Sequence, residues 1–455
     1  MEPGQVKTAA DAKKIVKERD LDYVKVGAFD IDGILRGKYM HRDKFFGALD
    51  KGFGFCDVVL GWDSNDQLYD FSSLTGWNTG FPDAEVEILP ESCREVPFED
   101  GMLMFLAQFA GEAEAYCPRG ILRRVIERAK KLGFSATAAC EFEFFVFDET
   151  PHSIREKNFR DLQPITPGFF GYSMLRNSVH AELYNEILET CTAMDMPIEG
   201  LHTETGAGVL EAALQHADAL SAADRAALFK TMVKVICQRQ GRMATFMAKW
   251  SHDWPGQSGH IHLSLAGKNG KAAFHDAKKE HGISDTMRHF IGGQQALMPE
   301  LLAMVAPTVN SFSRLIPGFW APTAATWGIE NRTCALRAIP GSEKAQRVEY
   351  RISAADINPY IAIAAALGSG LWGIENEIEP DAPMTGNAYE KSVPVKRSLP
   401  ATLFQAAEKL KRSKPARELF GDDFVGHYAQ TRQWEEREFR RAITSWEMER
   451  YFEII

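Results

Sequence analysis

Three short segments of the chain alternate between functional and apolar side chains. They are CEFEF at 140–144, GHIHLSL at 259–265 and RVEYRI at 347–352. Successive side chains of a β-strand point to opposite faces, so each segment is predicted to be a strand with one chemical face and one apolar face. The side chains expected on the chemical faces are Glu141, Glu143, His260, His262, Arg347, Glu349 and Arg351.

The rest of the pattern predicts mixed helices and strands. Apolar residues at helical spacing predict helices over 9–19, 118–132, 179–194 and 222–248, and a charged helical tail over 403–446 that breaks near Pro415 and Gly421. Strands are predicted as a pair over 22–38 joined by a turn at 30–33, as a strand-like region with many turns up to 109, and as a polar strand over 198–210. Because Pro118 opens a new periodic helix, we expect an N-terminal domain over 1–113 and a second domain over 114–455.

Composition narrows the class of protein. The chain has 455 residues, of which 45% are hydrophobic, and this is enough for one large or two moderate packed domains. A formal net charge of -10 argues against binding to nucleic acid or to an anionic membrane. The seven cysteines show no CxxC spacing, and neither a signal-peptide pattern nor a membrane-spanning stretch is evident. We therefore expect a cytoplasmic protein with reduced thiols.

The charged strand faces need a compensating partner. A Glu-x-Glu strand is most often a solvated sheet face, and Arg-x-Glu-x-Arg can be a surface ion-pair ladder. A His-x-His strand fits metal ligation better, and further acids flank the glycines at 206 and 208. Clustered acids repel unless cations neutralise them, so the pattern indicates two divalent cations, Mg²⁺ or Mn²⁺. The candidate ligands are Glu141, Glu143, Glu204, Glu211, His260 and Glu349.

Six motifs in order give the chain a family resemblance. They are Glu-Phe-Glu at 141–143, His-Thr-Glu at 202–204, Gly-His-Ile-His-Leu-Ser at 259–264, Asn-Ser-x-x-Arg-Leu-x-Pro-Gly at 310–318, Asn-Arg-x-x-x-x-Arg at 331–337 and Arg-x-Glu-x-Arg at 347–351. This order resembles the glutamine synthetase family over about 21–371. The resemblance implies an α+β fold, with a small β-grasp N-terminal domain and a large catalytic domain on a curved antiparallel sheet with flanking helices. It also implies a homo-oligomer, commonly a dodecamer of two hexameric rings with active sites between neighbouring subunits.

The family activity is the ATP-driven joining of the side-chain carboxylate of glutamate to an amine, with two or more metal ions in each site. By resemblance, one ion would be held by Glu143, Glu204 and Glu211, and the other by Glu141, His260 and Glu349. The positions that match phosphate and catalytic contacts are Arg332, Arg337 and Arg347. Those that match glutamate contacts are Arg314, Arg351 and Gly256, and those on the ATP side are Glu199, His262 and Ser264.

The chain departs from the family at the amine site. After Pro317-Gly318-Phe319, members that use ammonia carry a glutamate, whereas this chain has Trp320. Loss of that carboxylate removes the counter-charge for ammonium, and an indole offers apolar surface to a carbon substituent. Asp57 matches the acid that would accept the proton of the amine. We therefore expect a γ-glutamylamine ligase, with a monoamine favoured because a polyamine would favour several acids.

Two alternatives stay open. The chain could be an ammonia-dependent glutamine synthetase in which Asp57 receives ammonium. It could also be a non-catalytic structural or regulatory relative, although a scaffold gains nothing from a full set of mutually repelling acids.

Overall fold

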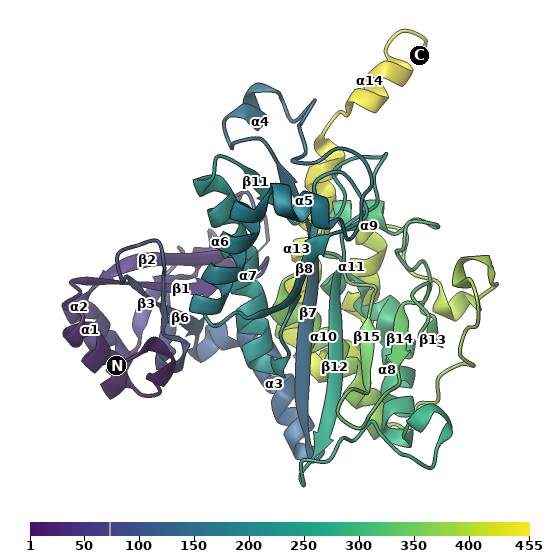
Figure 1. Cartoon of the computed structure of the whole chain (residues 1–455), viewed down its shortest axis with the longest axis horizontal. Coiled ribbons are helices and arrows are strands. Elements are labelled where there is room, and N and C mark those ends of the chain that lie inside the picture. Colours follow the sequence, from purple (N-terminus) through teal and green to yellow (C-terminus); the bar gives the residue numbers. More distant parts are fainter. Residues whose placement is uncertain (72–73) are drawn as a thin grey trace.

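Two sheets organise the chain in the computed structural model, which describes residues 1–71 and 74–455 (Figure 1). The strands are β1 (Tyr23–Phe29), β2 (Leu35–His41), β3 (Phe53–Cys56), β4 (Asp83–Ile88), β5 (Arg94–Glu95), β6 (Leu103–Phe109), β7 (Phe134–Phe147), β8 (Ile198–Thr203), β9 (Val209–Leu214), β10 (Ala217–Asp218), β11 (Met243–Thr245), β12 (Gly259–Gly267), β13 (Trp327–Ile329), β14 (Leu336–Ile339) and β15 (Arg347–Tyr350).

The α-helices are α1 (Ala9–Glu18), α2 (Arg42–Lys51), α3 (Pro118–Lys131), α4 (Ser153–Glu156), α5 (Met174–Val179), α6 (Ala181–Ala193), α7 (Ala219–Arg239), α8 (Asp285–Val305), α9 (Val309–Arg314), α10 (Pro359–Glu375), α11 (Leu403–Arg412), α12 (Lys414–Phe420), α13 (Asp422–Arg441) and α14 (Ser445–Tyr451). None of the helices within the described residues is both long and apolar enough to cross a membrane.

The smaller sheet belongs to the N-terminal part. Its order is β2-β1-β6-β4-β3, with β5 also paired to β6, and only β1 and β6 run parallel. Its core contains Val24, Phe45 and Phe105, so α2 packs on this sheet through Phe45. The boundary between 113 and 114 stays a prediction, and it falls inside a short 3₁₀ helix at Gly111–Tyr116.

The larger sheet carries the predicted chemistry. Its order is β13-β14-β15-β12-β7-β9-β8, and β10 and β11 also pair with β7. The long strands β7 and β12 run side by side at its centre, and α3, α7 and α10 contact β7 (Figure 1). The predicted α+β class is confirmed, but the sheet is mixed, because β13 runs parallel to β14.

Several predicted boundaries are wrong. The helix predicted over 222–248 ends at Arg239, because Gly241 takes a φ of 71° and the chain turns into β11. The strand predicted over 198–210 is two strands, since Gly206 and Gly208 form a turn at φ 140° and 69°. The strand predicted to 352 ends at Tyr350, and α2 lies within the region expected to be strand-like.

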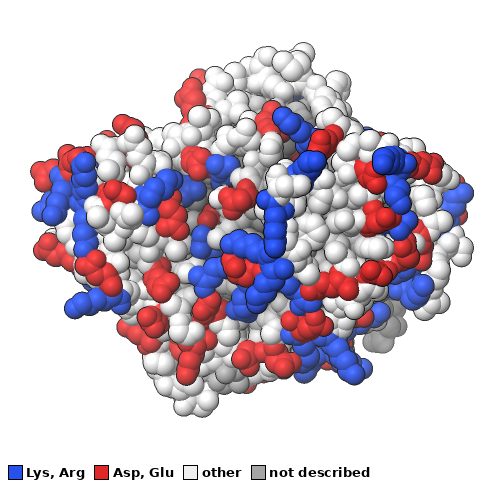
Figure 2. All heavy atoms as spheres, turned by 90° about the horizontal axis from the view of Figure 1, so that it is seen from below, with Lys and Arg blue, Asp and Glu red and all other residues white. Residues whose placement is uncertain are grey.

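Surface charge is mixed on the face seen from below (Figure 2). A group of Lys and Arg side chains lies beside a hollow near the middle, and Asp and Glu side chains surround it. On that face, one group of basic side chains lies beside the recess and the others are scattered among acidic ones, so they do not form a broad basic surface of the kind that binds nucleic acid.

Candidate active site

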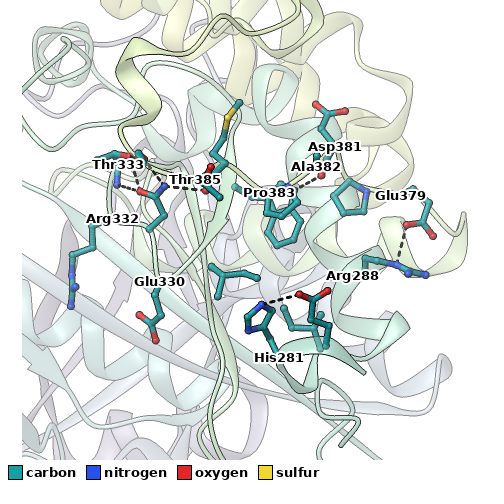
Figure 3. A pocket seen from close by; sticks show the side chains of 18 of the residues that line it. His281, Arg288, Glu330, Arg332, Thr333, Glu379, Asp381, Ala382, Pro383 and Thr385 are labelled. Atoms are coloured by element: carbon teal, nitrogen blue, oxygen red, sulfur yellow. Dashed lines mark hydrogen bonds and ion pairs between the residues drawn. The ribbon is translucent and has the colours of Figure 1, made fainter. Parts of the chain in front are cut away.

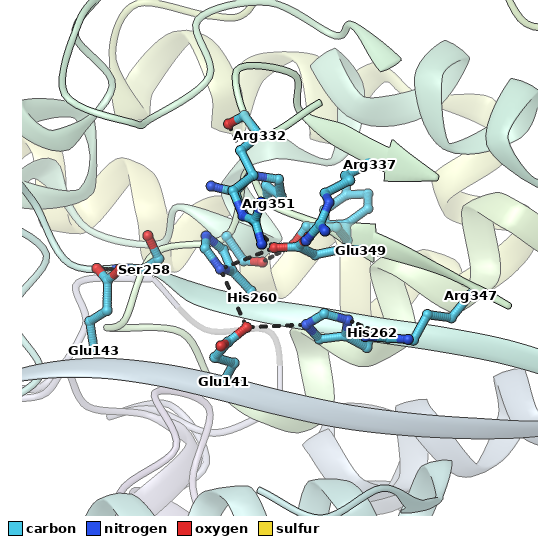
Figure 4. A network of polar contacts seen from close by, with 12 residues as sticks. Glu141, Glu143, Ser258, His260, His262, Arg332, Arg337, Arg347, Glu349 and Arg351 are labelled. Carbon is cyan, nitrogen blue, oxygen red and sulfur yellow. Dashed lines mark hydrogen bonds and ion pairs between the residues drawn. The ribbon is translucent and has the colours of Figure 1, made fainter. Parts of the chain in front are cut away.

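Strand register brings the distant acidic motifs together (Figure 4). β7 lies between β12 and β9, which sets Glu141 opposite His260 and Glu143 opposite Glu211. Directly opposed side chains on one face of an antiparallel pair have Cβ atoms about 4.5–5.5 Å apart. The sheet therefore places side chains from separate segments within reach of one bound ion.

Two histidines link Glu141 with Glu349. Nδ1 of His260 lies 3.3 Å from Oε1 of Glu349 and 3.8 Å from Oε2 of Glu141. Nε2 of His262 lies 3.2 Å from the same oxygen of Glu141, and His262 stands opposite Glu349 across β12 and β15. These four side chains form the first cluster of the site.

Three more acids form a second cluster beside the first. Glu143, Glu204 and Glu211 line a cavity of about 370 Å³, which we call the acid pocket. Oε2 of Glu143 accepts a hydrogen bond of 2.7 Å from the backbone amide of Ser258. Oε1 of Glu204 accepts from the amide and the hydroxyl of Thr205, at 2.9 and 2.7 Å. Both carboxylates are therefore oriented by the protein.

Two acids of the second cluster, Glu143 and Glu211, resist ionisation. Burial, with repulsion from Glu204, raises the pKa of Glu143 to about 7. Burial, with a hydrogen bond to Glu141 and repulsion from Glu143, raises the pKa of Glu211 to about 11. A carboxyl group whose pKa rises on folding contributes less stability as pH rises, and for Glu143 this loss runs from 4.5 to about 7. Bound cations would remove this penalty by neutralising the acids.

The two carboxyl groups of the first cluster, Glu141 and Glu349, are ionised at pH 7. Burial alone would raise the pKa of Glu141, but hydrogen bonds to His260 and His262 outweigh it and lower that pKa. Burial likewise opposes ionisation of Glu349, yet the charges of His260 and Arg351 bring its pKa down to about 2. Burial and the charge of Arg351 lower the pKa of His260 to about 4, so its ring is neutral at pH 7, as a metal ligand requires.

The donor atoms fit divalent cations. Nε2 of His260 is buried and has no hydrogen-bond partner among the described residues. Both ring nitrogens of His262 are engaged, since Nδ1 accepts from Arg347 at 3.2 Å and Nε2 faces Glu141. Two sets of three side chains each bring their possible metal-binding atoms within 4.8 Å of one another. The first set is Glu141, His262 and Glu349, and the second is His202, Glu204 and Glu211. Because His260 has a free ring nitrogen and His262 has none, His260 is the better candidate for a metal ligand. The assignment of three predicted ligands to each of two metal ions stays a prediction.

A basic pocket adjoins the first cluster. Its volume is about 500 Å³, and it shares Glu141, Arg332 and Arg337 with the acid pocket. Every residue predicted on the ATP side lines it, together with Lys344, which the sequence pattern did not identify because an isolated loop lysine has no diagnostic spacing. The functional side chains of this basic pocket are Glu199, His262, Ser264, Arg332, Arg337, Lys344 and Arg347.

Arg332 stands where three cavities meet. It lines the acid pocket, the basic pocket and a third cavity of about 1060 Å³, which we call the outer chamber. Trp320 lines both the acid pocket and the outer chamber. A guanidinium group at such a junction can contact anions that arrive from different sides.

The residues predicted to bind glutamate lie at different depths. Arg351 lines the acid pocket and donates from Nη1 to Glu349 and from Nε to the carbonyl of Arg332. Arg314 is only 1% exposed and does not line that pocket, and Nη2 donates to Oγ of Ser258 at 2.9 Å. Gly256 lines the pocket above Arg314, where a Cβ atom would lie 2.6 Å from Cγ of Arg314.

Asp57 lies away from this site. It is 4% exposed, accepts a hydrogen bond of 2.5 Å from Oγ1 of Thr75, and lines none of the three cavities. Burial, with repulsion from Asp83, raises its pKa despite the hydrogen bond from Thr75. The prediction that it completes the site of a neighbouring subunit stays a prediction.

The sequence pattern missed two further site residues. Tyr172 lines the acid pocket, and its ring centroid lies 4.4 Å from that of His202. Glu330 lines the outer chamber and pairs with Arg337, which also pairs with Glu349 at 3.0 Å. Both residues come from irregular segments, where no periodic pattern points to a function.

Comparison with known proteins gives a consistent family. Residues 115–451 match the glutamine synthetase catalytic domain. The chain is 45% identical to the type-1 glutamine synthetase 2 of Dictyostelium discoideum, over 95% of this chain and 84% of that protein. It is 37% identical to the glutamate–isopropylamine ligase of a Pseudomonas species, over 97% of this chain and 99% of that protein. The structure of a GmaS/ADP complex superposes with a TM-score of 0.85 at 26% identity, covering 97% of this chain and 99% of that chain. The chain therefore belongs to the glutamine synthetase family.

Proposed function

We propose that the chain is a glutamate–amine ligase, which uses ATP to join the γ-carboxylate of glutamate to an organic amine. The observation that carries the proposal is the meeting of three cavities at Arg332. A ligase of this kind must bring together a nucleotide, an acyl donor and an amine. The glutamate–isopropylamine ligase among the relatives supports this reaction class.

ATP would occupy the basic pocket. Arg337, Lys344 and Arg347 supply positive charge there, and guanidinium groups contact phosphate oxygens through paired hydrogen bonds. The related GmaS structure is an ADP complex, which supports the binding of an adenine nucleotide by this chain. The terminal phosphate would then point toward Arg332, where the basic pocket meets the acid pocket.

Glutamate would occupy the acid pocket. Family members use ATP and divalent metals, and we propose Mg²⁺ or Mn²⁺ held by the two clusters, with the six predicted ligands as the candidates. When bound, these cations would neutralise the acids and the transferred phosphoryl group. Arg351 would then bind the glutamate, while Arg314 holds Ser258 and the backbone beneath it in place.

The proposed reaction has two steps. An oxygen of the γ-carboxylate attacks the terminal phosphorus of ATP, the bond to ADP breaks, and γ-glutamyl phosphate forms. The neutral amine then attacks the γ-carbonyl carbon, the carbon–oxygen bond to phosphate breaks with its electron pair, and a proton passes to a base. Arg332 lies where it can stabilise the phosphate in both steps.

The test is a panel of amines at fixed glutamate and ATP, with phosphate release and the mass of the product as readouts. We expect organic amines to give γ-glutamylamides faster than ammonium gives glutamine. Ammonium outperforming every organic amine would favour the alternative, an ammonia-dependent glutamine synthetase, which the 45% identical Dictyostelium protein supports. If neither ammonium nor any organic amine caused phosphate release from ATP, the result would favour a non-catalytic relative.

Assembly is part of the same proposal. A dodecamer of two hexameric rings in the cytoplasm would let Asp57 of one subunit accept the amine proton in the site of its neighbour. Light scattering gives the mass of the oligomer. Mixed oligomers of the variants Asp57→Asn and Glu143→Gln test whether each active site contains residues from two subunits. Recovery of activity in the mixed oligomers is expected, whereas additive loss would contradict shared sites.

A further inference from the structure

The outer chamber is the largest of the three cavities that meet at Arg332, and neither ATP nor glutamate is placed in it (Figure 3). It opens beside β13 and the segment over 379–386. Its volume of about 1060 Å³ exceeds what ammonium or methylamine needs, and it is comparable to the largest pockets that hold drug-sized ligands, which reach about 1,000 Å³.

Trp320 forms the wall between the outer chamber and the acid pocket. Its φ is 60°, a conformation that is strained for a bulky residue and that persists where the surroundings enforce it. Its side chain is 56% exposed, and within residues 1–71 and 74–455 no aromatic ring or cation stacks on it. The indole face is therefore available to a ligand that passes between the two cavities.

The chamber combines apolar walls with carboxylates that are mostly paired with arginines. Ile283, Trp327, Ile329 and Met384 supply apolar surface, and Nε1 of Trp327 is already used in a 2.6 Å hydrogen bond to a backbone carbonyl. Three of the four carboxylates of the chamber pair with an arginine, and the pairs are Glu330 with Arg337, Glu379 with Arg288 and Asp381 with Arg397. The fourth, Glu280, is exposed and lies 3.4 Å from the ring of His281, a contact that is an ion pair only when the ring is protonated. Among the described residues that line the chamber, Glu280 is thus the one carboxylate without an arginine partner, and it stays in contact with solvent.

We propose that the outer chamber holds the carbon substituent of the amine, while its nitrogen passes Trp320 to the γ-carbonyl near Arg332. The inference rests on the proposed ligase function and names its substrate class. The substrate is a primary monoamine with a long alkyl or an aryl substituent, and polyamines are disfavoured. Burial of each methylene group is worth about a fourfold gain in kcat/KM.

The experiment measures kcat/KM for methylamine, propylamine, hexylamine, benzylamine and 1,6-diaminohexane. We expect hexylamine and benzylamine to exceed methylamine at least tenfold. We expect diaminohexane to fall below hexylamine, because its second ammonium group must lose hydration while only the solvent-exposed Glu280 lacks an arginine partner in the chamber. Equal values for all five amines would overturn the chamber assignment and leave the ligase function standing. Turnover of ammonium alone would overturn both.

Variants test the position of the substituent. Ile329→Trp fills the chamber, and we expect it to lower kcat/KM for hexylamine at least tenfold with little change for methylamine or in the KM for ATP. Thr385→Trp fills the chamber from a loop and replaces the first variant if that one fails to fold. Val395→Trp is the matched control, because Val395 is 88% exposed and lies outside the chamber. Equal loss for hexylamine and methylamine in both chamber variants would overturn the assignment.

Discussion

The two faces of β7 divide the work of the site. One face carries Glu141 and Glu143, which are set against other acids and a histidine. The other face buries Phe142 and Phe144, which pack on Phe229 of α7 with ring centroids 6.3 and 6.0 Å away. The acids lower the stability of the fold, and the apolar side chains on the opposite face of the same strand raise it. A substitution on the acidic face should therefore change activity and not stability, and a substitution on the apolar face should change stability and not activity.

The largest expected effect is on the chemical face. Glu143→Gln keeps the shape and can still accept from Ser258, but it removes a charge that a bound cation needs. We expect turnover to fall about a thousandfold or more, which corresponds to about 4 kcal/mol in activation free energy. Thermal unfolding should stay the same or shift upward, because a buried carboxyl that resists ionisation has gone. Wild-type turnover would contradict the assignment of Glu143 as a metal ligand.

The apolar face should show the opposite behaviour. Phe142→Ala leaves a cavity beneath the acids, and we expect a loss of about 3 kcal/mol or more in the free energy of unfolding, measured by urea denaturation. The KM for ATP in the folded fraction should change little. Phe142→Leu is the graded control, with an expected loss of about 1 kcal/mol. A large change in the KM for ATP without loss of stability would show that the two faces are not separable.

Cation binding should link the two faces. Mn²⁺ at a hundred times its dissociation constant should raise the free energy of unfolding by about 2.7 kcal/mol, because it binds the folded clusters only. The readout is thermal unfolding with and without Mn²⁺. The shift should shrink in Glu143→Gln and persist in Phe142→Leu. If Mn²⁺ raised the unfolding temperature of both variants by the same amount, the ion would bind at a site that does not include Glu143.

The smallest expected effect lies at the edge of the chemical face. Arg347 lines the basic pocket and orients the ring of His262. Arg347→Ala should raise the KM for ATP about tenfold, which corresponds to about 1.4 kcal/mol, with glutamate affinity unchanged. Arg347→Lys should recover part of the loss, since the charge remains. A loss of affinity for glutamate, with the KM for ATP unchanged, would contradict this role and would assign Arg347 to glutamate binding in the acid pocket.

Much of this site could be predicted because strand alternation is local. Glu141 and Glu143 face one way because neighbouring residues in a strand alternate, whatever the strand pairs with. The end of α7 was harder to predict, because the residues after Gly241 form β11 by pairing with β7, a strand far away in the sequence. Lys344 and Tyr172 could not be predicted, because both come from segments whose position depends on the rest of the fold.

The sequence by itself determined which side chains share a face and which residue types could hold cations and phosphates. Only the tertiary structure decided that Glu143 stands opposite Glu211, that Arg314 is buried beneath the acid pocket, and that three cavities meet at Arg332. The physical reason is that side-chain alternation depends on neighbouring residues, whereas register and cavities depend on contacts between strands and loops far apart in the chain.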